Sequence, residues 1–243
     1  MEGPSLVILK ETLKAFRRKK VIAVSGASKI NQQRLQNKTI LEFKTWGKHF
    51  LIVFKGFFVR IHFLMFGSYR INEQKPNRLS LGLDFDDGQQ LNFYTCAIKM
   101  FDGHPDDIYD YRVDVMSDAW DEKKCRRTLK KQPDTMVCDA LLDQEIFAGV
   151  GNIIKNEVLF RIKVHPETKT DALPPRKLTE LINEARNYSF DFYEWKKIFV
   201  LKKHWLIYGK RTCPRCKIPV VRKPTGENPR RSFYCESCQT MYK

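Results

Sequence analysis

Residues 134–166, DTMVCDALLDQEIFAGVGNIIKNEVLFRIKVHP, decide how this chain is organised. Asp134 is a good N-cap for an apolar helix over residues 136–142, and a second short helical piece holds Ile146 and Phe147. The chain then breaks at glycine, and a third helix follows. The stretch therefore predicts two helices, a tight turn and a third helix.

The turn before the third helix combines Gly149, Gly151 and Asn152. Because glycine has no Cβ, backbone N–H groups and a helix N-terminus can approach a phosphate closely. Asn152 can cap this helix, whose apolar residues recur at three- and four-residue steps and predict one packed face and one wet face. An anion-binding clamp is one interpretation, and an ordinary helical hairpin punctuated by glycine is the other.

The charge of the chain indicates a polyanionic partner. Its 243 residues include 44 Lys and Arg against 28 Asp and Glu, which leaves a formal charge of +16 spread along the sequence. Each phosphate that is neutralised releases counterions, so a nucleic acid is the first expectation and a membrane surface the weaker one. No apolar run approaches the ~20 residues of a membrane span, and basic residues interrupt the N-terminal apolar positions, which argues against a signal peptide.

Four of the seven cysteines form two C-x-x-C pairs, Cys213 with Cys216 and Cys235 with Cys238. Four thiolates in two such turns make a closed tetrahedral shell that suits Zn²⁺, and the closed shell predicts a structural zinc rather than a catalytic one. A redox role for the pairs is the alternative. The odd number of cysteines favours metal binding in a reducing compartment over disulfides, so we expect an intracellular protein of the cytoplasm or nucleoid.

The first half of the chain changes from a helical period to a period of two. Ser5 is the expected N-cap of a helix with its apolar face from Leu6 to Phe16. From residue 21 to 116 the pattern predicts a β-sandwich or barrel, with a hairpin turn at Asp87-Gly88. The expected strands are Thr39–Phe43, Phe50–Phe54, Phe58–Phe63, Leu79–Phe85 and Gln90–Tyr94.

Two more helices are expected in the second half. Asp121 can cap a basic helix, whose charges either face solvent or contact nucleic acid. A long helix begins after Leu173-Pro174-Pro175, and its apolar residues from Leu178 to Trp195 keep the helical period of a core-packing face. The predicted fold class is α+β with several domains: an N-terminal β-sandwich, a helical domain and a C-terminal zinc ribbon.

The stretch at 134–166 closely resembles the helix-two-turns-helix segment of the formamidopyrimidine-DNA glycosylase and endonuclease VIII family. In that family a G-V-G-N element grips the phosphates beside a damaged nucleotide. Two further family signatures stand at matching places, Glu2-Gly3-Pro4 at the start and the four-cysteine finger at the end. The resemblance implies a β-sandwich catalytic domain over 1–116, a helix-two-turns-helix DNA-binding domain over 117–205 and a zinc finger over 206–243.

The resemblance also implies a reaction, the removal of a damaged base followed by strand cleavage. Family chains begin Pro-Glu-Gly-Pro; the Pro amine attacks the sugar C1′, and the Glu acts as an acid near the sugar ring. Glu2 matches that Glu, but Met1 stands where the first Pro belongs. A free α-amino group has an ordinary pKa near ~8, so Met1 can supply a primary amine nucleophile. The other interpretation is that a leading Pro has been lost.

Four residues match family positions that hold phosphates. Lys48, within Trp46-Gly47-Lys48-His49, matches a Lys that contacts phosphate and assists proton transfer during strand cleavage. Gly151 and Asn152 match the phosphate clamp. Arg230 matches the finger Arg that inserts near the lesion, and Arg231 competes for that role.

A run of bulky apolar residues, Leu64, Met65 and Phe66, follows a predicted strand. By resemblance, this loop is a wedge that fills the gap left by an everted base, the device by which proteins unstack a base step. Simple core packing is the alternative.

The expected partner is double-stranded DNA that contains damaged bases or abasic sites, bound by a monomer. Oxidised pyrimidines and the endonuclease VIII branch are favoured, because residues 97–101, AIKMF, do not reproduce the Asp-Pro-Arg-Arg-Phe motif of the formamidopyrimidine branch. There is also little room before Cys213 for that branch's lesion-capping loop. Two alternatives stay open: a nucleic-acid-binding protein without chemistry, and a glycosylase fold inactivated at Met1.

Overall fold

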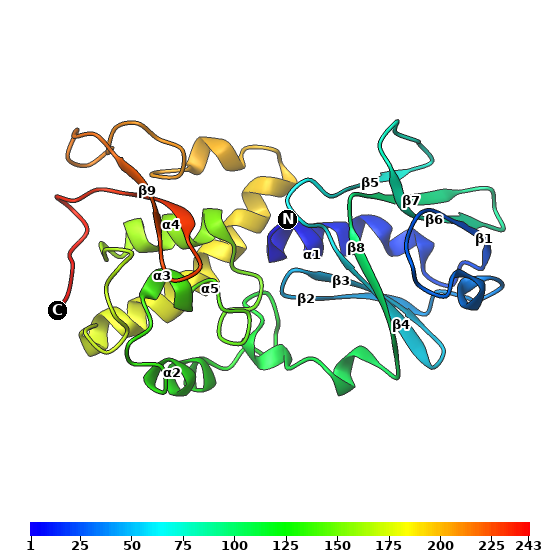
Figure 1. The fold of residues 1–243 in the computed structure, drawn as a ribbon, viewed down its shortest axis with the longest axis horizontal. Coiled ribbons are helices and arrows are strands. Elements are labelled where there is room, and N and C mark those ends of the chain that lie inside the picture. Colours follow the sequence, from blue (N-terminus) through cyan, green and yellow to red (C-terminus); the bar gives the residue numbers. More distant parts are fainter. The chain divides into compact units, whose positions relative to one another are not determined.

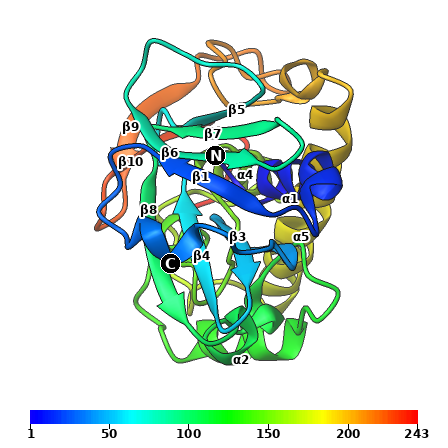
Figure 2. The same ribbon diagram turned by 90° about the vertical axis from the view of Figure 1, so that its right-hand side faces the viewer.

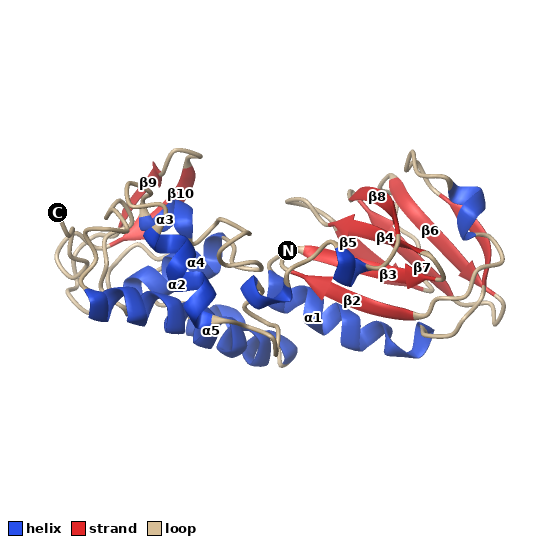
Figure 3. Ribbon diagram, turned by 90° about the horizontal axis from the view of Figure 1, so that it is seen from below, coloured by secondary structure: helices blue, strands red, loops and turns tan.

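The computed structural model describes residues 1–243, which form two compact units. The first holds Met1 and Leu6–Asp110, and the second holds Glu2–Ser5 and Tyr111–Lys243. The first unit carries strands β1 to β8, and the second carries helices α2 to α5 (Figure 3). None of the helices has the length and apolar character needed to cross a membrane.

Helix α1 (Gly3–Thr12) continues as a short 3-10 helix (Leu13–Phe16). It begins two residues before Ser5, so the predicted N-cap at Ser5 was wrong; Ser5 instead donates its backbone N–H to the Glu2 carbonyl at 3.0 Å. The apolar face from Leu6 to Phe16 is buried in the core of the first unit, as the period predicted.

Two four-stranded antiparallel sheets form the first unit, one in the order β2-β3-β4-β8 and the other in the order β1-β6-β7-β5. Figure 2 shows the second sheet with its strands in that order. Apolar residues of both sheets enclose one core. The strands are β1 (Val21–Ser25), β2 (Glu42–Trp46), β3 (His49–Phe54), β4 (Phe57–His62), β5 (Ser68–Ile71), β6 (Leu79–Phe85), β7 (Gln90–Tyr94) and β8 (Ala97–Asp102).

The strands were predicted with uneven success. β6 and β7 match their predicted bounds, and Gly88 turns between them with a φ of 81°. The predicted strand Thr39–Phe43 is displaced, since β2 begins at Glu42. The sequence pattern missed β1, β5 and β8; β5 and β8 have no fully buried residue, so their apolar signal is weak.

Four helices build the core of the second unit: α2 (Glu122–Lys130), α3 (Val137–Ala140), α4 (Asn152–Arg161) and α5 (Pro175–Lys197) (Figure 1). Asp121 caps α2 as predicted, because its Oδ1 accepts the Lys124 N–H at 2.9 Å. The apolar face of α5 packs in this core.

Three local predictions about the central stretch were wrong. Met136, not Asp134, is the N-cap of α3, and Asp134 pairs with Lys169 at 2.8 Å instead. The residues around Ile146 and Phe147 form turns rather than a helix. Gly151, not Asn152, is the N-cap of α4.

The polar face of α4 was predicted to be wet, and this was also wrong. Lys155, Asn156 and Glu157 are buried along with the apolar residues around them. The hairpin of β9 (Val221–Thr225) and β10 (Arg230–Tyr234) lies against the helix, where Lys155 donates to Ser232 and Asn156 accepts the Phe233 N–H. With the hairpin, the structure has the predicted parts, a β-sandwich, a helical domain and a C-terminal finger with two cysteine pairs.

Candidate active site and nucleic-acid interface

The Glu2 carboxylate lies at the N-terminus of α4. Its Oε1 accepts the Ile153 N–H at 2.7 Å, and its Oε2 accepts the Ile154 N–H at 3.3 Å. The Gly3 N–H donates to the Gly149 carbonyl at 2.9 Å and holds the preceding backbone in place. Because a helix N-terminus carries about half a positive charge, this position favours an ionised carboxylate.

Gly151 makes room for this carboxylate. A Cβ at Gly151 would lie 2.4 Å from Glu2 Cδ and 2.6 Å from its Oε1, well inside van der Waals contact. The φ of Gly151 is −119°, which any residue can adopt, so the close approach and not the backbone angle requires glycine. The turn that was interpreted as a phosphate clamp thus also seats Glu2.

Asn152 and Asn156 hold the β9–β10 hairpin against α4. Asn152 Nδ2 donates to the Arg231 carbonyl at 3.0 Å, and Asn156 Oδ1 accepts the Phe233 N–H at 2.7 Å. The Oδ1 of Asn152 is buried and has no hydrogen-bond partner in the structure. Asn152 is therefore already engaged with the hairpin, while one polar atom of its amide is left unsatisfied.

A second set of contacts anchors the same hairpin. Lys155 Nζ donates to Ser232 Oγ at 2.9 Å, and the Glu227 N–H donates to Asp139 Oδ2 at 3.0 Å. Burial lowers the pKa of the Lys155 ammonium to about 8. The anchored strand β10 leaves the Arg230 and Arg231 side chains exposed, so the geometry does not choose between these two candidates.

The first unit holds the other predicted residues. The Met1 amine donates to the Leu64 carbonyl at 3.4 Å. The side chains of Leu64, Met65 and Phe66 are 48%, 73% and 79% exposed, which excludes core packing for this loop. Leu64 has a left-handed φ of 39°, so the loop keeps a bulky apolar side chain in an unfavourable conformation.

Lys48 lies in the tight turn between β2 and β3, next to two histidines that the sequence reasoning did not single out. His49 on β3 pairs with His62 on β4, and burial lowers the pKa of His49 to about 3. Burial, the Met1 amine, Lys48 and Arg60 all lower the pKa of His62. The cations around the histidines are the Met1 amine, Lys48 and Arg60, and their charge favours a bound anion. The sequence reasoning missed the two histidines because they meet only through the register of β3 and β4, and a single sequence does not reveal that register.

The four predicted metal-ligating cysteines meet in the second unit. Their Sγ atoms all lie within 4.8 Å of one another, and Cys213 Sγ is 3.7 Å from Cys238 Sγ. Zn–S bonds of about 2.3 Å in a tetrahedron place sulfurs roughly 3.8 Å apart, so the four thiols are close enough together to hold one metal ion.

Two family models match the chain. The formamidopyrimidine-DNA glycosylase N-terminal domain matches residues 7–96, and the H2TH domain of the same glycosylase matches residues 113–188. The chain belongs to the formamidopyrimidine-DNA glycosylase and endonuclease VIII family. Curated relatives agree with the predicted branch. Endonuclease 8-like 3 from Bos taurus is 33% identical over 81% of this chain, and Endonuclease 8 2 from Mycobacterium bovis is 26% identical over 84% of it.

This family member spans about a third of the length of Endonuclease 8-like 3, 34%, but 85% of the Mycobacterium bovis protein. Solved structures support the fold. A viral DNA glycosylase superposes with a TM-score of 0.86 at 23% identity, over 99% of this chain and 100% of that one. The formamidopyrimidine-DNA glycosylase of Lactococcus lactis, bound to DNA with an AP site, gives 0.86 at 22% identity with the same coverage.

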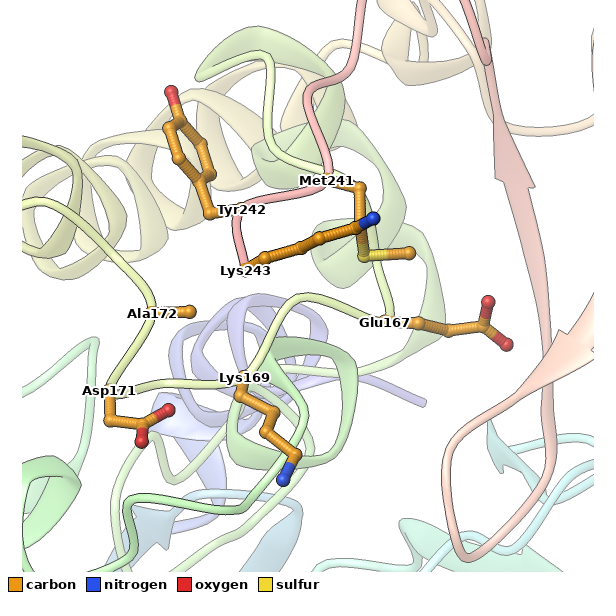
Figure 4. A pocket seen from close by; sticks show the side chains of 7 residues that line it. All are labelled: Glu167, Lys169, Asp171, Ala172, Met241, Tyr242 and Lys243. Atoms are coloured by element: carbon orange, nitrogen blue, oxygen red, sulfur yellow. The ribbon is translucent and has the colours of Figure 1, made fainter.

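A pocket of about 600 Å³ in the second unit is lined by none of the predicted catalytic, DNA-binding or metal-ligating residues. It is lined by Glu167, Lys169, Asp171, Ala172, Met241, Tyr242 and Lys243. Its charged side chains do not converge on one point (Figure 4). A catalytic site needs groups aimed at a common reacting atom, so this pocket is not a second candidate.

Proposed function

We propose that this chain is a DNA glycosylase with AP lyase activity that acts on double-stranded DNA containing damaged bases or abasic sites. The observation that carries the proposal is the Glu2 carboxylate, seated on the N-terminus of α4 where Gly151 leaves space. Glu2 directly follows the residue whose amine is the family's nucleophile. A carboxylate held beside that amine is suited to proton transfer at the sugar.

In the proposed reaction, the Met1 amine forms a bond to C1′ of the damaged nucleotide as the bond from C1′ to the base breaks. The Glu2 carboxylate takes the proton that the amine loses and gives it to the sugar ring oxygen as the ring opens to a Schiff base, and the departing base takes its proton from water. Loss of a C2′ proton then releases the 3′ phosphate, and a second elimination releases the 5′ phosphate. The covalent intermediate divides one difficult step into easier ones.

The remaining residues position the strand in this proposal. Lys48, Asn152, Gly151 and one of the two hairpin arginines bind the phosphates beside the lesion. The half-buried histidine pair adds His62 to the proposed phosphate-binding groups beside Lys48. The exposed apolar loop from Leu64 to Phe66 enters the base stack in place of the everted nucleotide.

Zinc is the proposed metal of the cysteine cluster. Cys213, Cys216, Cys235 and Cys238 would fill all four positions of a tetrahedral ion and leave none for substrate. The metal would therefore hold the finger that carries Arg230 and Arg231. The division into functional domains at 1–116, 117–205 and 206–243 stays a prediction, as does action as a monomer inside the cell.

Oxidised pyrimidines are the proposed lesions. The segment between α5 and Cys213 is short, and residues 97–101 lack the arginine pair of the formamidopyrimidine branch. The names of the curated relatives, endonuclease 8 and endonuclease 8-like, support the endonuclease VIII branch, for which the sequence resemblance favours these lesions.

Met1 supports one alternative, a protein of this fold that binds damaged DNA without lyase chemistry. Borohydride trapping on a duplex with one abasic site separates the two, and an intact mass of the same preparation identifies the first residue. The expected result is a covalent adduct that a tryptic map places on the terminal amine. The control is the same protein with an acetylated N-terminus, because an amide cannot form a Schiff base. Tight DNA binding without an adduct would favour the alternative.

A further inference from the structure

The turn after α5 presents an aromatic side chain where folding alone would favour glycine. The Phe199 N–H donates to the Lys196 carbonyl at 3.1 Å, and the Val200 N–H donates to the Trp195 carbonyl at 2.9 Å. This pair of bonds defines a Schellman motif with Phe199 at the left-handed position after the C-cap, usually glycine. Its φ is 60°.

The free-energy cost of the left-handed backbone at Phe199 is not offset by burial of its side chain. The Phe199 side chain is 95% exposed, the highest value among the large apolar side chains, and the preceding Ile198 is 67% exposed. A side chain in the left-handed region destabilises the fold, and a phenyl ring in water contributes no packing. An unfavourable backbone angle with an exposed apolar side chain is typical of a functional contact.

The turn that carries Phe199 is firmly held. Trp195 stacks on His204 with ring centroids 4.1 Å apart and an interplanar angle of 2°, and Leu201 is buried in the helical core. The Lys203 N–H closes the following turn on the Val200 carbonyl at 2.8 Å. The ring of Phe199 is thus presented by an ordered backbone, so little entropy is lost when a partner packs on it.

Positive charge surrounds the exposed ring. Lys196, Lys197, Lys202 and Lys203 are all exposed within four residues of Phe199, and Glu194 is the only acidic residue among residues 194–204. Proteins that bind unpaired nucleic acid combine these two features, cations for the backbone phosphates and aromatic rings on which bases stack. An interfacial membrane contact usually presents a much larger apolar face than two side chains.

We propose that Ile198 and Phe199 form a base-stacking tip that binds an unpaired nucleobase while the four lysines hold the adjoining phosphates. The proposal rests on the proposed function in one respect, since an enzyme that everts a base exposes unpaired nucleotides. It lies outside the residues to which that chemistry is assigned. Every residue of the tip belongs to the second unit.

Phe199→Gly tests the tip because it restores the residue that the turn favours. Fluorescence anisotropy would compare binding of oligothymidine, of a duplex with one unpaired thymine, and of a fully paired duplex. We expect the variant to lose about 5- to 100-fold in affinity for the first two, as one lost base–aromatic stack implies, and less than twofold for the paired duplex. Its melting temperature should be unchanged or higher, and Phe199→Trp should restore binding.

The matched control is Ile108→Ala, which removes an exposed apolar side chain that lies among aspartates. It should leave all three affinities unchanged. Equal affinities for Phe199→Gly and the parent chain would overturn the proposal, as would an equal loss on the paired duplex. A loss of binding to vesicles of phosphatidylserine and phosphatidylcholine, with DNA binding intact, would assign the tip to membranes and overturn it too.

Borohydride trapping of the same variants separates the two proposals. If the parent chain forms no adduct but Phe199→Gly still weakens binding to unpaired bases, the stacking tip holds and the lyase chemistry fails. If the adduct forms and Phe199→Gly binds every DNA like the parent chain, the chemistry holds and the tip fails.

Discussion

Two glutamates of the second unit, Glu2 and Glu157, use the same kind of contact for different ends. Glu2 accepts backbone N–H groups from Ile153 and Ile154 at the start of α4. Glu157, inside the same helix, accepts backbone N–H groups at 2.8 to 3.1 Å from three consecutive residues, Leu206, Ile207 and Tyr208. Both carboxylates accept hydrogen bonds from backbone N–H groups.

The difference lies in access. Glu157 is fully buried, and its contacts tie the segment before the cysteine cluster to α4. Glu2 is only partly buried and lies on a helix end. Buried polar groups with every bond made stabilise one conformation, whereas a partly exposed carboxylate at a helix N-terminus can still exchange a proton with a ligand. This difference is the reason why we propose a chemical role for Glu2 and a structural role for Glu157.

The largest expected effect is on the activity of Glu2→Gln. An amide keeps an acceptor for the Ile153 N–H but cannot transfer the proton, so we expect base removal to fall by about 10²- to 10⁴-fold. The free energy of unfolding and the affinity for abasic-site DNA should change little. Single-turnover release of an oxidised pyrimidine measures the first quantity. An unchanged rate of base removal by Glu2→Gln would contradict the chemical role proposed for Glu2.

Glu157→Gln should show the opposite pattern. A neutral amide has one acceptor for three donors and loses the charge-assisted bonds, so we expect a loss of about 3 kcal/mol in the free energy of unfolding. Urea denaturation measures it, with Glu194→Gln on the exposed part of α5 as the matched control. The fraction that remains folded should keep its turnover. A loss of turnover without a loss of stability would reverse the two assignments.

A smaller effect concerns Lys155, which lies on α4 between the contacts of the two glutamates. Burial lowers its folded-state pKa to about 8, below the ordinary value of 10.5, so the unfolded chain binds more protons between these values and stability rises with pH there. Relative to Lys155→Met, the parent chain should gain about 2 kcal/mol in unfolding free energy from pH 8 to pH 10. The free energy of unfolding is measured by urea titration at each pH. If it changes with pH in the same way for the parent chain and for Lys155→Met, the Lys155 ammonium is not desolvated in the fold.

Patterns carried by many residues were predicted well, and those that depend on one contact were not. The structure has the helix predicted by the period of α5, the strands predicted by the alternation of β6 and β7, and the cluster predicted by the spacing of the four cysteines. The N-caps placed at Ser5, Asp134 and Asn152 were wrong. At the start of each helix a backbone N–H bonds to a residue distant in sequence: Gly3 to Gly149, Val137 to Thr168 and Ile153 to Glu2. A cap residue is a weak local preference, and tertiary contacts override it.

The sequence by itself determined the family, through motifs at Glu2-Gly3-Pro4, residues 134–166 and the cysteine pairs, because spacing and residue type are local properties of a chain. The tertiary structure decided which polar side chains are buried. Only the packing of the β9–β10 hairpin on α4 encloses Lys155, and only the approach of the N-terminus places Glu2 on Gly151. These contacts join residues that are far apart in the sequence, so the distances between them are set only when the chain folds.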